Sequence, residues 1–128
     1  MVERFRGADL GLKGDKGPTW NGKKKTWAAF WYKQKVFLKL CNGGRLEATV
    51  DGADIGEKQS DDEKVRDGYK RRNLLVWRYM HRSVSDVTVA GQSLLMMIAD
   101  DFGEDNDGNE LMLYFKADAA EQTDTDVE

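Results

Sequence analysis

The sequence predicts an α+β fold that is mostly β: a small OB-like barrel or sandwich of about six or seven antiparallel strands with one short helix. Several short segments alternate apolar and polar residues and are separated by glycine-containing turns, which is the pattern of half-buried strands. The single helix signal lies between two groups of such segments. This order of strands, helix and strands suits a partly open OB-like barrel, and it suits other small α+β or sandwich folds equally well.

The chain has 128 residues, which is enough for one domain with a core of its own. Residues 1–18 are rich in glycine and lack periodicity, so we expect a basic, Gly-rich arm. Residues 19–116 hold the apolar segments and are predicted to form a single globular domain. Residues 117–128 contain no large apolar cluster and are predicted to be an acidic, disordered tail.

The first predicted hairpin covers residues 36–50, "VFLKLCNGGRLEATV". A two-residue loop at Asn42-Gly43 would mix apolar and polar side chains on both faces of the hairpin. A three-residue loop over 42–44 keeps the apolar side chains on one face and sets Lys39 opposite Glu47. The face pattern therefore selects the three-residue loop.

One helix is predicted over residues 60–72, "SDDEKVRDGYKRR". Ser60 and Glu63 have the spacing of a capping box at its start, and Asn73 suits a left-handed stop at its end. The next segment, 74–82, is rich in aromatic and aliphatic residues. It could continue the helix or form a strand, and we predict a strand.

A second hairpin is predicted over residues 84–99, with Gly91-Gln92 as its two-residue turn. After an acidic loop, a further strand is predicted over 110–116, because Leu111, Leu113 and Phe115 alternate with other residues.

Charge is segregated along the chain, although the net charge is only −3. Residues 1–45 carry eleven basic and three acidic groups, a net charge of +8, and residues 46–99 carry eight and nine. Residues 100–128 carry one basic and eleven acidic groups, a net charge of −10. Such segregation informs on binding partners rather than on the fold.

Catalysis finds little support in the sequence, so we predict a protein that is not an enzyme and needs no cofactor. The single histidine, His81, and the single cysteine, Cys41, would form a pair only if the fold brought them together. Two soft ligands do not make a tetrahedral zinc site. A calcium loop with Gly108 as its sixth residue would place Gly103 and Tyr114 where carboxylates are required.

The sequence also indicates an intracellular protein without a membrane-spanning segment. No apolar run approaches the length needed to cross a bilayer, and the first residues lack the apolar stretch of a secretory signal. A single cysteine cannot form an internal disulfide.

The strongest functional signal is the stretch 26–40, in which aromatic residues and lysines are interleaved. As one bent strand, it would bury one face and display aromatic rings and ammonium groups on the other, as a groove for single-stranded nucleic acid requires. The predicted stacking residues are Trp27, Trp31 and Phe37, and the predicted phosphate contacts are Lys23, Lys24, Lys25, Lys33, Lys35 and Lys39. The alternative is that the tryptophans are core residues and the lysines only solvate its rim.

The sequence therefore leads to one preferred function and one alternative. The first is a non-catalytic domain that binds nucleic acid, single-stranded DNA or RNA, and whose acidic tail competes for its own basic face. The second is a protein-interaction or assembly subunit, a viral- or phage-like accessory or oligomeric structural protein, which uses the aromatic face as an interface and forms homo-oligomers when the basic and acidic ends of different copies meet.

Overall fold

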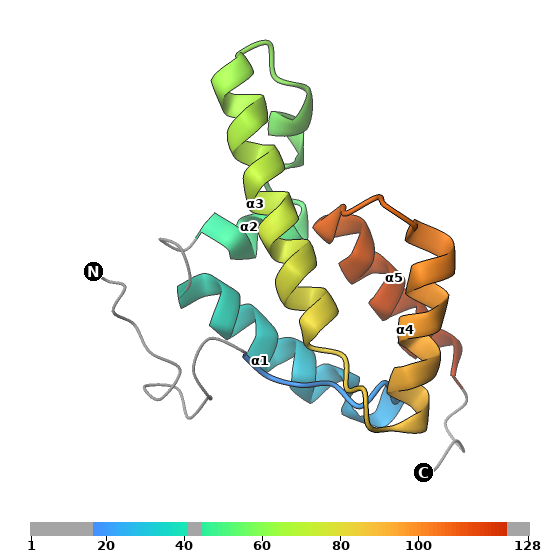
Figure 1. Cartoon of the computed structure of the whole chain (residues 1–128). Coiled ribbons are helices and arrows are strands. Elements are labelled where there is room, and N and C mark those ends of the chain that lie inside the picture. The colour runs from blue at the N-terminus through green and yellow to red at the C-terminus, as the bar shows by residue number, and fades with distance from the viewer. Residues whose placement is uncertain (1–16, 41–44, 123–128) are drawn as a thin grey trace.

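The computed structural model describes residues 17–40 and 45–122, and they form a helical protein (Figure 1). None of these residues belongs to a β-strand, so the predicted OB-like barrel or sandwich is wrong. The elements, in chain order, are the 3-10 helix η2 (Lys24–Thr26), α1 (Trp27–Leu40), α2 (Arg45–Asp51), the 3-10 helix η4 (Ile55–Gln59), α3 (Glu63–Arg82), α4 (Val89–Phe102) and α5 (Gly108–Glu121).

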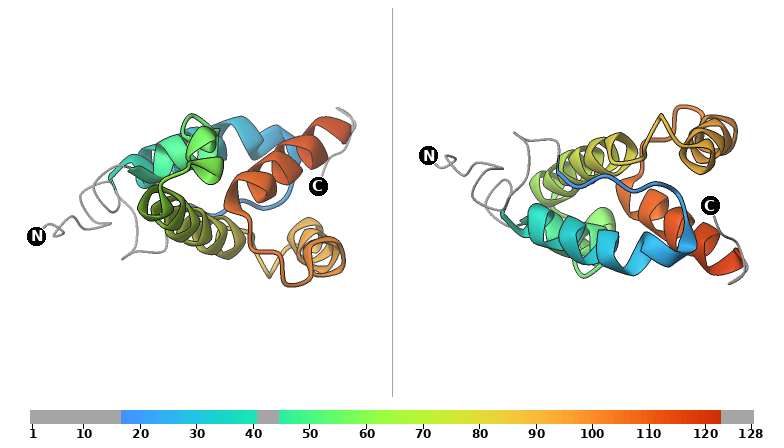
Figure 2. Two further views of the ribbon diagram at one scale, coloured as in Figure 1. Left: turned by 90° about the horizontal axis from the view of Figure 1, so that it is seen from above. Right: turned by 90° about the horizontal axis from the view of Figure 1, so that it is seen from below.

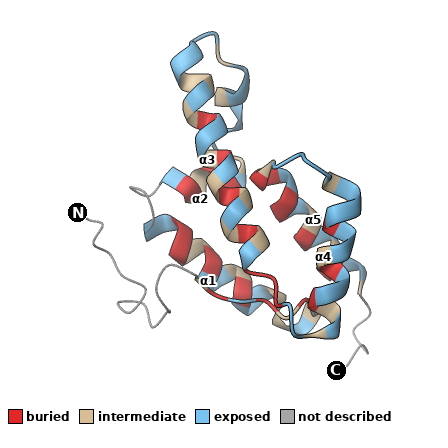
Figure 3. Cartoon of the chain, viewed as in Figure 1, coloured by how far each residue is buried: buried red, intermediate tan, exposed pale blue. Residues whose placement is uncertain are grey.

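The long helix α3 is the centre of the arrangement. α2 and α5 both pack against it, and α1 packs against α2 (Figures 1 and 2). α4 lies at the outside, next to α5. The first turns of α3 project beyond the other helices together with η4, and most of their residues are exposed (Figure 3).

The predicted hairpin over 36–50 is wrong, because its first half belongs to α1 and its second half to α2. α1 buries Phe30, Gln34, Phe37 and Leu38, which recur every three or four residues and so lie on one side of a helix. The proposed loop, 42–44, lies outside the described residues.

The predicted helix over 60–72 exists, but it begins later and extends further. Asp62 is the N-cap and accepts a hydrogen bond from the backbone N–H of Lys64 at 2.9 Å, while Ser60 only supports the preceding turn. The helix does not stop at Asn73, and it includes the whole of 74–82. The strand predicted for 74–82 is therefore wrong, since this segment continues the helix.

The predicted hairpin over 84–99 is replaced by the linker before α4 and most of α4 itself. Thr88 caps this helix by accepting a hydrogen bond from the backbone N–H of Gly91 at 3.0 Å. A Cβ atom on Gly91 would collide with the carbonyl oxygen of Ser85, so this glycine serves close packing rather than a hairpin turn.

The strand predicted over 110–116 is wrong as well, because these residues form the middle of α5. Its buried side chains, Leu111, Met112, Phe115 and Ala119, have helical spacing. α5 continues to Glu121, so the first residues assigned to the acidic tail are helical. The rest of that tail, 123–128, and residues 1–16 of the predicted arm lie outside the described residues.

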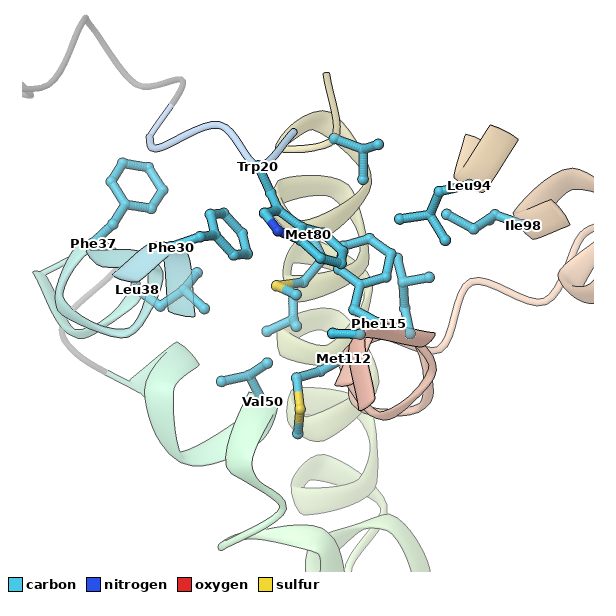
Figure 4. Packing of buried hydrophobic residues seen from close by; sticks show 14 of the residues in the cluster. Trp20, Phe30, Phe37, Leu38, Val50, Met80, Leu94, Ile98, Met112 and Phe115 are labelled. Atoms are coloured by element: carbon cyan, nitrogen blue, oxygen red, sulfur yellow. The ribbon is translucent and has the colours of Figure 1, made fainter. Parts of the chain in front are cut away.

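Trp20 lies at the middle of the apolar core and is fully buried (Figure 4). Its ring centroid is 5.9 Å from that of Phe30 and 5.6 Å from that of Phe115, so it joins α1 to α5. The backbone N–H of Trp20 donates to the carbonyl of Ser83 at 2.7 Å, and the N–H of Ser85 donates to the carbonyl of Trp20 at 2.9 Å. The segment before α1 is thus held against the linker between α3 and α4.

A polar junction fixes the start of α5 against α2 and α3. Asp107 caps α5 by accepting from the backbone N–H of Glu110 at 3.0 Å, and it accepts from the side-chain amide of Asn73 at 2.9 Å. The side-chain amide of Asn109 donates to the carbonyl of Val50 at 2.9 Å. A Cβ atom on Gly108 would lie only 2.5 Å from backbone atoms of α3, so glycine allows the two helices to touch here.

The charge of Asp107 makes this junction sensitive to pH. Burial raises the pKa of the Asp107 carboxyl, but its hydrogen bonds to Asn73 and Glu110 and the nearby charge of Lys58 outweigh burial, and the pKa lies below its ordinary value. A lowered folded-state pKa stabilises the fold above the unfolded-state value and loses this contribution as the pH falls through the folded-state value.

We therefore expect Asp107→Asn to reduce the loss of unfolding free energy between about pH 5 and about pH 2. Asparagine retains the capping oxygen but has no proton to gain in this range. Urea unfolding at a series of pH values measures the effect. Asp105→Asn, in the same loop and without these hydrogen bonds, is the matched control and should leave the slope unchanged. Equal slopes for the parent and Asp107→Asn would contradict this assignment.

Candidate functional site

The helical form of residues 27–40 separates the side chains that were predicted to share one strand face. Successive residues on a helix are about 100° apart, so a spacing of four keeps side chains on one side and a spacing of two does not. Trp27, Trp31 and Lys35 lie in line along α1, and we call these three residues the aromatic stripe. Phe37 belongs to the buried face of α1, and Lys33 is exposed on the side of that face away from the aromatic stripe.

The two rings of the aromatic stripe already stack on each other. The ring centroids of Trp27 and Trp31 are 5.6 Å apart with an interplanar angle of 7°. Lys35 Nζ lies 5.7 Å from the ring of Trp31, and Trp27 packs edge-on against Trp20 at 5.0 Å. The rings are half-buried and occupied by partners within the chain, which leaves no open platform between them for a base.

Phe37 is 1% exposed and lies edge-on to Tyr79, with ring centroids 5.2 Å apart. A base could reach this ring only if α1 left the core. The prediction of Phe37 as a stacking residue is corrected for this reason, and the strand face on which the single-strand groove depended is absent from the described residues.

Of the six lysines predicted to contact phosphate, Lys23 precedes η2 and the others are spread over η2 and α1. Lys33 and Lys39 are exposed, and Lys35 is half-buried over Trp31. Lys24 is tied to the end of α5: its backbone N–H donates to the Gln122 side chain at 2.8 Å, and its Nζ donates to the Gln122 carbonyl at 3.2 Å. The role of these lysines, including Lys23 and Lys25, in binding phosphate stays a prediction.

An acidic surface lies where α4 ends and α5 begins. Asp100, Asp101, Glu104 and Asp105 are all exposed there. Asp101 accepts a hydrogen bond from the Tyr114 hydroxyl at 2.6 Å, and burial together with this carboxylate raises the pKa of Tyr114 to about 12. We call these four acidic residues the acidic end.

An exposed apolar surface on α4 was missed by the sequence analysis. Residues 87–99, "VTVAGQSLLMMIA", contain no charged side chain. Leu94 and Ile98 point into the core, whereas Val87 and Val89 are each 83% exposed and Met96 is 71% exposed. We call Val87, which lies just before α4, together with Val89, Met96 and the partly exposed Met97 the α4 face. The absence of charge in this segment is visible in the sequence. It did not suggest an exposed surface, because the segment was predicted to be a hairpin with buried faces.

Within residues 17–40 and 45–122, no three His, Cys, Asp or Glu side chains come together as metal ligands would. His81 stacks on Trp77 with ring centroids 5.7 Å apart, and burial lowers its pKa. It borders an apolar hollow of about 360 Å³ on α3 with Leu74 and Arg78. Cys41 lies outside the described residues, so neither the Cys–His pair nor the absence of enzymatic activity is tested.

No helix among those described is long and apolar enough to cross a membrane. In comparisons with models of known protein families, with curated proteins and with solved structures, the chain matches none of them. The chemistry and placement of its own side chains therefore carry the functional inference.

If the tryptophans of the aromatic stripe pack as described, replacing either one should lower the free energy of unfolding, and Trp27 should matter more than Trp31. Trp27→Ala should lower the free energy of unfolding by about 2–3 kcal/mol, somewhat less than the loss of a fully buried aromatic ring. Trp31→Ala should cost about 1–2 kcal/mol, because its ring packs one layer further from Trp20. Denaturant unfolding measures both values.

Tyr32→Ala is the matched control, because Tyr32 is 68% exposed on the same helix. Its effect should stay within about 0.5 kcal/mol. If Trp27→Ala were as stable as this control, the ring would be a free surface group, in conflict with the packing described above.

Proposed function

We propose that this chain is a non-catalytic assembly subunit whose copies associate through oppositely charged ends. The observation that carries the proposal is the separation of charge on the surface. Lys33, Lys35 and Lys39 lie along α1 and form what we call the basic end. The acidic end lies in the last turn of α4 and the loop that follows it, on the opposite side of the molecule (Figure 1).

The two ends do not neutralise each other within one molecule. The ion pairs among the described residues lie mainly around η4, where Arg72 pairs with Asp54 at 3.0 Å and with Glu57 at 2.6 Å. Lys58 pairs with Asp107 at 3.4 Å. None of the ion pairs in residues 17–40 and 45–122 joins the basic end to the acidic end.

Contact between the basic end of one copy and the acidic end of the next is a head-to-tail contact. Such contacts join two different surfaces, and they generate closed rings or open chains of subunits. Each exposed ion pair contributes at most about 1 kcal/mol, so several must act together and the association should weaken in salt. Electrostatic complementarity of this kind mainly supplies orientation and a fast association rate.

The test is sedimentation velocity of the purified, nuclease-treated full chain at two salt concentrations. Raising the salt from about 0.02 M to about 0.5 M shortens the Debye length from roughly 20 Å to roughly 4 Å. We expect larger species at low salt that dissociate at high salt. The double variant Lys33→Gln/Lys39→Gln should remove the low-salt species.

The matched control is Lys64→Gln/Lys70→Gln, which removes two exposed lysines from α3 and the same total charge. It should associate like the parent. A monomer under all conditions would contradict the proposal. Larger species that form only after an oligonucleotide is added would favour nucleic-acid binding instead.

A further inference from the structure

α4 has apolar side chains on the side that faces solvent as well as on the side that faces the core. Leu94 and Ile98 occupy the buried side, and Val89, Ser93, Met96 and Asp100 follow one another on the outer side at spacings of three and four residues. Figure 3 shows the outer side of α4 as exposed. Single exposed apolar residues are common, but several of them gathered on one surface mark an interaction surface.

The charges at the ends of α4 are arranged against its own helix dipole. Asp100 and Asp101 lie in the last turn, which holds no basic residue, and the first turn holds no acidic residue. Negative groups are favourable at the amino end of a helix and unfavourable at the carboxyl end. α3 shows the favourable arrangement, with Glu63 in its first turn and Arg82 in its last.

An antiparallel partner would reverse this penalty. If the outer sides of two α4 helices met head to foot, Asp100 of each copy would lie beside the amino end of the other helix, near Val89. Met96 of one copy would then lie over the small Ser93 of the other. The two Asp100 carboxylates would stay roughly 17 Å apart, beyond the Debye length at physiological salt.

We propose that the α4 face is a two-fold interface with a second copy of this chain, α4 packing antiparallel to α4. The contact is self-complementary, as a two-fold interface must be. It shares Asp100 with the acidic end and uses no residue of the basic end. One helix face per copy gives a small interface, so the dimer should be weak, with a dissociation constant on the order of 10–500 μM.

The experiment is sedimentation equilibrium of the full chain up to about 1 mM protein in about 0.5 M salt, where contacts between exposed charges are screened. We expect a monomer–dimer equilibrium. Met96→Lys should weaken the dimer at least about tenfold, because it places a charge in the centre of the interface. Leu113→Lys, at an exposed apolar position of α5, is the matched control and should leave dimerisation unchanged.

Asp100→Lys distinguishes the specific antiparallel contact from nonspecific association of apolar surfaces. Lysine suits the carboxyl end of α4 in the monomer, so the melting temperature should hold or rise. In about 0.1 M salt, with Lys33→Gln/Lys39→Gln also present to remove association through the charged ends, Asp100→Lys should weaken the dimer by about tenfold. Circular dichroism confirms that each variant is folded. The proposal is overturned by a monomer at every concentration, or by a dimer that tolerates Met96→Lys. A dimer that tolerates Asp100→Lys would exclude the antiparallel arrangement.

Lys33→Gln/Lys39→Gln is measured under the same conditions and should leave this dimer intact. Its loss in that variant would assign the association to the charged ends and overturn the α4 interface. The proposal of association through the charged ends and the proposal of the α4 dimer can thus be contradicted independently.

Discussion

The buried indole of Trp20 holds together parts of the chain that are far apart in sequence. Its ring contacts α1 and α5, its Nε1–H donates to the carbonyl of Lys23 at 3.0 Å, and its backbone pairs with Ser83 and Ser85. The next residue, Asn21, accepts a hydrogen bond from the hydroxyl of Thr88, the cap of α4, at 2.9 Å. The start of α4, and with it the position of the α4 face, thus depends on the segment that Trp20 anchors.

Because the tryptophans near the amino end pack on one another, the surfaces left for binding lie elsewhere. The aromatic stripe extends the core outward from Trp20 along α1. Exposed groups include Lys33 and Lys39 of the basic end, the carboxylates of the acidic end and the apolar side chains of the α4 face. The contacts proposed between copies are therefore of two kinds, one through exposed charges that salt screens and one mainly through apolar side chains.

The sequence predicted the helix beginning near residue 60 and the segregation of charge, but it mispredicted the other elements. In α1, the buried polar Gln34 and the exposed Tyr32 and Leu40 weaken the helical period and imitate an alternating strand. In α5, Leu111, Met112, Phe115 and Ala119 have the spacing of a helix face. The sequence analysis instead followed the alternation of apolar residues over 110–116 and predicted a strand. α4 carries apolar residues on its buried and its exposed side. The spacing of its apolar residues therefore could not distinguish a strand covered on both faces from a helix with an exposed apolar surface. Trp20 contacts residues that are far away in the sequence, and such contacts cannot be predicted from the residues next to it.

Native-state hydrogen exchange of the Trp20 and Ser85 backbone amides tests most directly whether this segment belongs to the cooperative core. Both N–H groups donate across the junction between the segment before α1 and the α3–α4 linker. We expect them to exchange only through global unfolding, with the same dependence on denaturant as the amides of Val76 and Met80 in the middle of α3. Rapid exchange of Trp20 and Ser85 without denaturant dependence, while the α3 amides stay protected, would show that the segment opens independently and that the core does not depend on Trp20.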